Sequence, residues 1–352
     1  VEAADFSTSY TIGTLTATNL TVTNDATING LTVGKGANSV ANNTVLGDDA
    51  LDAAVTGDNN VAIGRSALSA NTSGYNNTGI GSGAASGLTT GGDNVAVGFN
   101  TMLATVTGNE NTAIGNDSLK ALTTGNNNVA AGANALAANT TGTNNVAIGE
   151  SAALAATTST GNVVIGQEAV KTGVFTGFNN VVIGKLAGED LTSADANVII
   201  GEDAGKNQTT ADSNVLIGQG AGEATTTGAL NTVIGQGAYA SSTTGNRSVA
   251  LGVQAMGTGT NTGQKNIAIG YQAGKPITSG VRNVVIGDEA GIAMTTGGTN
   301  TIVGTEAGKA IVTTGDNTIV GNEAGKLNTS TLTAFGAFAG HDHVDGYSNT
   351  FI

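Results

Sequence analysis

The chain has 352 residues, of which 55 are glycine and none is cysteine, and its formal net charge is −14 at pH 7. The absence of cysteine excludes disulfides and thiolate metal sites, and the negative charge argues against nucleic-acid binding, which depends on Lys and Arg at phosphates. No apolar run reaches the roughly 18–20 residues that a membrane-spanning helix needs, so we expect no membrane insertion.

The first 34 residues lie outside the pattern that fills the rest of the chain. Residues 1–12 show no regular spacing of apolar residues and are predicted to be a linker. Residues 13–34 alternate apolar and polar side chains, which favours short strands, so we predict a β-rich neck. The chain begins at Val1 without a signal-peptide pattern, and we expect it to be a fragment or a processed product.

From residue 35 to residue 352, one short phrase returns at a nearly fixed interval. It consists of an Asn (position 0), three mostly apolar residues and a Gly (position 4), as in residues 60–64 and 145–149, and most steps are 17 residues. The steps to Gly184 and Gly270 are 18 residues, and the step to Gly336 is 15. A fixed period of this length indicates a stacked solenoid. The last repeat is cut at Ile352 before its Gly, so we expect the protein to continue.

Each repeat is predicted to form one strand of an all-β, parallel β-roll (a β-solenoid) with about one coil per 17 residues. Positions 1 and 3 are mostly Val, Ile, Thr or Leu, which are typical of strands. The Gly is expected to form a backbone corner, the Ala at position 7 to suit a narrow interior, and the Asn to bond along the axis as in other side-chain ladders. With strands about 4.8 Å apart, such a rod is on the order of 85 Å long.

Position 2, between the two β-branched positions, is apolar and never charged. A strand that is apolar on both faces is buried on both faces. We therefore expect positions 1 and 3 to fill the coil and position 2 to contact other copies of the chain. The residues predicted to form this interface are Ala62, Ala147, Val164, Val182, Ile199, Leu216, Val233, Val285, Ile302 and Ile319.

The repeated phrase resembles known fibrous proteins. Asn-Asn-Val-Ala-Ile-Gly, at 59–64 and 144–149, resembles the head repeat of trimeric autotransporter adhesins, whose heads are left-handed parallel β-rolls packed as homotrimers. The longer repeats with Asn-Thr-Ala-Ile-Gly (111–115) and Tyr-Gln-Ala-Gly (271–274), and the neck, are similar to bacteriophage tail fibres and related virion appendages. The resemblance implies a homotrimer.

The function that this resemblance implies is structural. We expect the shaft of a phage tail fibre on the virion, attached to other virion or baseplate proteins and presenting a tip that binds a host surface receptor or glycan. The alternative is the head of a bacterial trimeric adhesin on the cell surface. No cofactor is implied.

Catalytic and ligand-binding chemistry is sparse in this sequence. A nucleophile with a histidine base would have to use His341 or His343, the only two histidines, so we expect no enzyme. In a trimer these histidines could supply six nitrogens to an octahedral metal ion; the alternative is that both lie on an outer loop. Glycines in register with the coils argue against phosphate loops. Calcium-binding nonapeptides are disfavoured because only scattered pieces of their pattern occur, as at residues 91–94. An ice-binding Thr face is disfavoured because Thr-Thr-Gly turns are expected to drift in phase.

Overall fold

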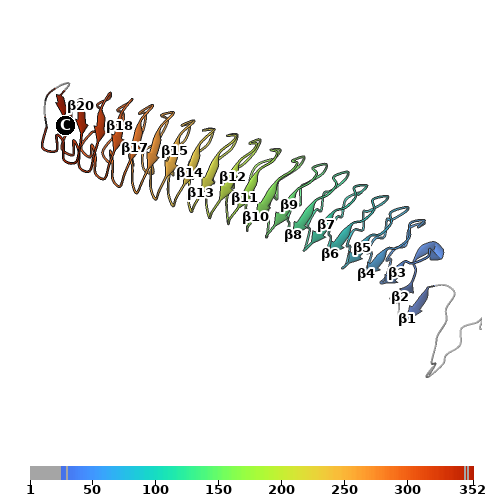
Figure 1. Ribbon diagram of the computed structural model, residues 1–352. Coiled ribbons are helices and arrows are strands. Elements are labelled where there is room, and N and C mark those ends of the chain that lie inside the picture. The colour runs from blue at the N-terminus through green and yellow to red at the C-terminus, as the bar shows by residue number, and fades with distance from the viewer. Residues whose placement is uncertain (1–24, 29–30, 345, 347–348) are drawn as a thin grey trace, which may run out of the picture.

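The computed structural model describes residues 25–28, 31–344, 346 and 349–352 of the chain, and these form one long rod (Figure 1). The described residues are all-β, with a single sheet of 21 strands and no α-helix. They form a β-solenoid of about 18 coils with a repeat of about 17 residues, as the period predicts. The predicted linker over residues 1–12 and the first part of the neck lie outside the described residues.

Most strands are three residues long, and each coil contributes one. The strands are β1 (Ala26–Ile28), β2 (Leu31–Gly34), β3 (Thr44–Leu46), β4 (Val61–Ile63), β5 (Thr78–Ile80), β6 (Val95–Val97), β7 (Thr112–Ile114), β8 (Val129–Ala131), β9 (Val146–Ile148), β10 (Val163–Ile165), β11 (Val181–Ile183), β12 (Val198–Ile200), β13 (Val215–Ile217), β14 (Thr232–Ile234), β15 (Val249–Leu251), β16 (Ile267–Ile269), β17 (Val284–Ile286), β18 (Thr301–Val303), β19 (Thr318–Val320), β20 (Leu332–Phe335) and β21 (Asn349–Phe351).

The strands from β3 to β21 are all parallel and pair in chain order, so that equivalent positions lie above one another. The strand register is unchanged across the 18-residue and 15-residue steps of the repeat. β10 pairs with β11 and β15 with β16 at the same positions as elsewhere. The extra residue of each 18-residue step therefore lies in a loop. Across the 15-residue step, Thr318 still lies opposite Thr333.

The described part of the predicted neck forms two short strands at the first coil. β1 and β2 pair antiparallel, and β2 pairs antiparallel with β3. A 3-10 turn over Ala37–Ser39 follows β2. β2 therefore covers the edge of β3 that has no coil beneath it, and an open edge of this kind is a template for unwanted strand pairing.

The Gly at position 4 is required by two independent features of the stack. Gly201 has a φ of 134°, which side-chain-bearing residues rarely adopt. A Cβ placed on Gly201 would also lie 2.6 Å from the carbonyl carbon of Gly218 in the next coil. The same close approach recurs from coil to coil, for example from Gly64 to Gly81. The glycines thus form a column in which backbone stacks directly on backbone.

The Asn at position 0 forms the ladder along the axis that the sequence predicts, and this expectation is confirmed. The Asn197 Oδ1 accepts the N–H of Asn214, 2.9 Å away, and the Asn197 Nδ2 donates to the carbonyl of Ala211, also at 2.9 Å. Asn197 is fully buried, so these bonds satisfy polar groups that would otherwise be costly. Ser248 occupies one rung, and the ladder ends where the N–H of Leu332 donates to Asn317.

The prediction that position 2 contacts other copies is wrong, because in the single chain these side chains point into the coil. The ten residues of the predicted interface are at most 1% exposed, whereas positions 1 and 3 are partly exposed on the opposite face. Successive strand residues point to opposite sides, so position 2 lies on the same side as the buried Asn at position 0. The residues found in the interior are Ala62, Ala147, Val164, Val182, Ile199, Leu216, Val233, Val285, Ile302 and Ile319.

The size of the side chain at position 2 varies because position 8 fills the same interior. In many coils a small residue at position 2 is accompanied by a large one at position 8, as in Ala113 and Leu119, and a large residue at position 2 by Gly, as in Ile302 and Gly308. Other coils depart from this pairing, with two small residues at Ala268 and Gly274, at Ala147 and Ala153, and at Gly79 and Ala85, and two large ones at Val233 and Tyr239 and at Val45 and Leu51. A Cβ on Gly308 would lie 3.2 Å from the Ile302 Cδ1. In the coils that show this pairing, positions 2 and 8 together fill the interior, as close packing requires. The same compensation holds for Ala62 and Leu68, Ala130 and Leu136, Ala250 and Met256, Ile199 and Gly205, Leu216 and Gly222, and Ile319 and Gly325.

Candidate functional site: the outward strand face

Positions 1 and 3 of the stacked strands form one continuous outer surface, which we call the strand face. It is defined by the first and third residues of β3 to β19 together with Thr333 and Phe335 of β20. No charged residue lies on it, and nearly all of its members are Val, Ile, Thr or Leu. Ile114 is 46% exposed and Ile234 is 42% exposed. In the single chain, residue types that are typical of protein cores are therefore exposed to water.

The dimensions of the strand face exceed those of an ordinary surface patch. Its 18 rows are about 4.8 Å apart and each strand is about 10 Å long, so the face covers an area on the order of 800 Å². The largest apolar patch on a typical monomer is roughly 300–600 Å². A stable protein–protein interface covers about 800 Å² on each partner. The strand face therefore has the size and composition of one side of an interface.

Charged side chains lie on the outer edge of the rod that follows the glycine column, which we call the rim. In the last coils they form a chain of ion pairs: Lys309 contacts Glu306 at 3.0 Å, and Lys326 contacts both Glu306 and Glu323. Hydrogen bonds from the Lys326 ammonium lower the pKa of Glu306 and of Glu323, and these carboxylates raise the pKa of Lys326. The pairs are half-buried at the surface and link neighbouring coils weakly.

His341 and His343 lie on the loop between β20 and β21. The His341 Nε2 lies 3.3 Å from a carboxylate oxygen of Glu323, and the His343 Nε2 lies 2.8 Å from the Asn349 Nδ2. The His343 ring also packs against Phe351. Across the described ranges, no three His, Cys, Asp or Glu side chains are grouped so that they could hold a metal ion. A metal site formed by His341 and His343 would need further chains.

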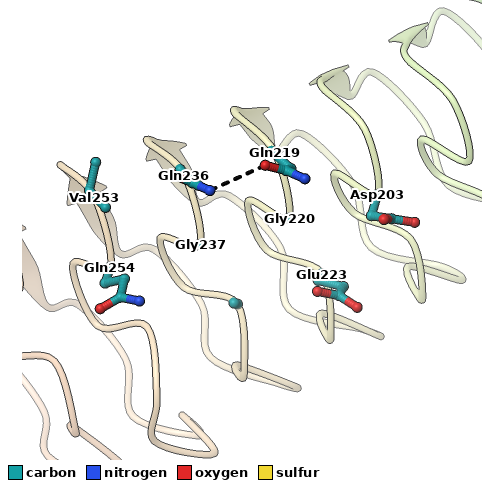
Figure 2. A pocket seen from close by; sticks show the side chains of 9 residues that line it. Asp203, Gln219, Gly220, Glu223, Gln236, Gly237, Val253 and Gln254 are labelled. Atoms are coloured by element: carbon teal, nitrogen blue, oxygen red, sulfur yellow. Dashed lines mark hydrogen bonds between the residues drawn. The ribbon is translucent and has the colours of Figure 1, made fainter.

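A polar hollow of about 330 Å³ lies on the rim near the middle of the rod. Its position follows from two consecutive coils that carry Gly at position 6, namely Gly220 and Gly237, where most other coils carry a side chain. Figure 2 shows both glycines beside Gln219 and Gln236, whose amides hydrogen-bond to each other at 3.2 Å. Glu223 also lines the hollow. These groups can bind hydroxyls and amides, but they do not include a nucleophile with a base.

Several Thr-Thr-Gly turns stack in register, against the expected drift in phase, whereas the turn at 313–315 is shifted by one residue because Thr295 lies against Val312. The Thr123 hydroxyl donates to the carbonyl of Thr140 at 2.9 Å, and the Thr140 hydroxyl donates to that of Thr157 at 3.2 Å. Because hydrogen bonds link the loops as well as the strands, small loop insertions do not shift the repeat. The hydroxyls of these stacked Thr residues donate hydrogen bonds to carbonyls of the next coil.

Comparison with known proteins found neither a protein-family model nor a curated protein that matches the chain. Within the described residues, no helix has the length and apolar character needed to cross a membrane. The strand face was missed by sequence reasoning because the two faces of the strand were exchanged. The compensation between positions 2 and 8 is the signal in the sequence that identifies the inner face.

Proposed function

We propose that the chain is the structural shaft of a fibrous appendage, in which copies pack through their strand faces as a homotrimer. The observation that supports this proposal is the uncharged strand face, which runs from β3 to β20. Burying apolar area of this size is favourable by about 25 cal/mol per Å² before the costs of association. Three such faces directed toward a common axis would cover one another and leave the charged rims in water.

The construction of the coil suits a structural role as a long, stiff rod. Each coil has its own packed interior, nearly every coil has an Asn rung, and hydrogen bonds along the axis join neighbouring coils in strands and loops alike. The stability of such a stack is a sum of coil and interface contributions, so the length of the rod is set by the number of repeats. As the shaft of a phage tail fibre, it would attach to other virion proteins and hold a receptor-binding tip away from the particle.

The second candidate is the head of a bacterial trimeric adhesin, displayed on the cell surface. It uses the same trimer but places binding on the outer side of the rod. The observation that favours it is the polar hollow at Gly220 and Gly237, because an inert shaft needs no break in its rim. A receptor or glycan bound there would contact amide and carboxylate groups such as those of Gln236 and Glu223.

The trimer proposal is tested by comparing outward and inward substitutions in the same region. Replacing Ile200, Ile217 and Ile234, at position 3 of consecutive coils, by Asp places charges on the strand face without touching the interior. We expect a folded protein that is monomeric, measured by circular dichroism and by size exclusion with light scattering. Leu216→Asp, in the interior of the same region, should instead unfold the neighbouring coils.

The matched control replaces Ile200, Ile217 and Ile234 by Thr, which already occupies the strand face at Thr232. This control should remain associated, since Thr adds no charge. If the triple Asp protein kept the same molar mass as the unmodified chain, the strand face would not be the interface. Attachment to a virion or a cell is a separate question, answered by immunogold labelling of the native particle.

A further inference from the structure

Three cationic side chains occupy equivalent positions in consecutive coils, just before the strands, in a chain whose net charge is −14. Arg247, Lys265 and Arg282 each occupy the residue before position 0 in consecutive coils, where the backbone is left-handed with φ values of 55°, 60° and 58°. Their backbone positions are held in register, because the N–H of Lys265 donates to Asn246 and that of Arg282 to Gln264. All three side chains are exposed. We call this set the basic row.

The basic row is not neutralised by the part of the chain that the structure describes. No carboxylate there lies within 4.0 Å of the three side-chain nitrogens. The residues that precede the three cations are the neutral Asn246, Gln264 and Val281, and those that follow the Asn column are Val or Ile. Other cations of the rod, such as Lys206 and Lys309, are paired with carboxylates of the same or a neighbouring coil.

An unpaired row of this kind has an electrostatic cost in the free protein. Equivalent residues of adjacent coils are about 4.8 Å apart, and like charges directly opposite one another on neighbouring strands are destabilising. Elsewhere the same column holds neutral amides, such as Asn127 and Asn144. A bound anion would be attracted to each of the three cations and would offset their mutual repulsion.

A hollow lies between two members of the basic row. It has a volume of about 180 Å³ and is lined by Lys265, Arg282, Thr262, Gln264 and Val281. The Thr262 hydroxyl and the Gln264 amide add neutral hydrogen-bonding groups beside the two charges. An Arg guanidinium binds phosphate, sulfate or carboxylate through two parallel hydrogen bonds, and Lys adds a point charge.

We propose that the basic row is a binding site for a short, multiply charged oxyanion segment that lies along the rod axis, with phosphate or sulfate groups over Arg247, Lys265 and Arg282. The row spans three coils, about 10 Å, so the segment holds two or three anionic groups. A long polyanion is disfavoured because the column continues to Asp316 and the chain as a whole carries a charge of −14. This site is independent of the strand face and of the proposed shaft function.

The test measures binding of two defined probes to the full chain by isothermal titration calorimetry at low salt. The probes are inorganic tripolyphosphate and a sulfated heparin tetrasaccharide, with neutral maltotetraose as the comparison. Binding of tripolyphosphate alone would indicate a phosphate-bearing source, and binding of the tetrasaccharide alone would indicate a sulfated sugar. Binding of neither probe would overturn the proposal.

The charge variant replaces Arg247, Lys265 and Arg282 by Gln. We expect binding to weaken by about tenfold or more, because three charge-assisted contacts are removed. The matched control replaces Arg65, Lys185 and Lys275 by Gln.

The control removes the same charge from cations that lie in separate coils and also lack a carboxylate partner in the described chain. It should bind as the unmodified protein does. Equal weakening in both variants would show that only the net charge matters, and a change of molar mass in the charge variant alone would show that the row contacts another copy; either result refutes the proposal.

Discussion

The compensation between positions 2 and 8 makes a quantitative prediction for the coil that contains Ile302 and Gly308. Ile302→Ala alone leaves a cavity in the interior and should destabilise the coil by about 2–5 kcal/mol. Gly308→Leu alone overfills the same space, since its Cβ would meet the Cδ1 atoms of Ile311 and Ile302 at 3.1 and 3.2 Å. We expect it to cost about 1–3 kcal/mol.

The double variant Ile302→Ala with Gly308→Leu recreates the arrangement of Ala113 and Leu119. The left-handed backbone accepts this change, because Leu119 has a φ of 48° at the equivalent position. The two substitutions should therefore compensate, with a favourable coupling of roughly 2 kcal/mol.

The assay for this coupling is hydrogen exchange of peptides spanning β17 to β19, because the stability of a solenoid is local to its coils. The single variants should lose protection in these coils and the double variant should regain most of it. If the double variant lost as much as the two single variants together, positions 2 and 8 would not share one interior, and our assignment of the inner face would fail.

Three further predictions concern the ladder, the glycine column and the ion pairs. Asn197→Leu leaves two buried backbone groups unpaired and should cost roughly 1–3 kcal/mol for each, seen as lost exchange protection around β12 and β13; unchanged protection would contradict the ladder's role. Gly201→Ala combines backbone strain with a backbone clash and should destabilise the fold by about 2–6 kcal/mol. The midpoint of thermal unfolding should fall, and an unaltered midpoint would be inconsistent with the stacked glycine column. The lowered pKa values of Glu306 and Glu323 mean that their stabilisation is present above pH 4.5 and lost as the pH falls below it. Exchange in the last coils should then rise at acidic pH, an effect that Gln at both positions removes.

Much of the fold could be predicted from the sequence because the repeat is regular at the level of single residues. The period predicted the strands, the Gly corners and the Asn ladder. The extra residues of the 18-residue steps lie in loops, so they do not change the strand register. The inner and outer faces could not be assigned from alternation alone, since a three-residue strand is apolar on both sides. Residues such as Ile63 and Ile183 have the composition of a core, yet they lie outside because position 2 shares its side with the buried Asn.

The candidate sites depended on the same distinction. Once Leu216 is placed inside and Ile217 outside, the continuous apolar surface becomes visible as a property of positions 1 and 3. The basic row could have been found from the sequence, because Arg247, Lys265 and Arg282 share one phase of the repeat. Its lack of carboxylate partners required the structure, since pairing depends on the neighbouring coils.

The central claim is that the strand face is covered by two further copies of the chain. Sedimentation equilibrium of the unmodified protein at micromolar concentration tests it most directly. We predict a single species with three times the 34.2 kDa mass of the chain. A single species of 34.2 kDa would show that the strand face remains in water and would contradict the proposed trimer.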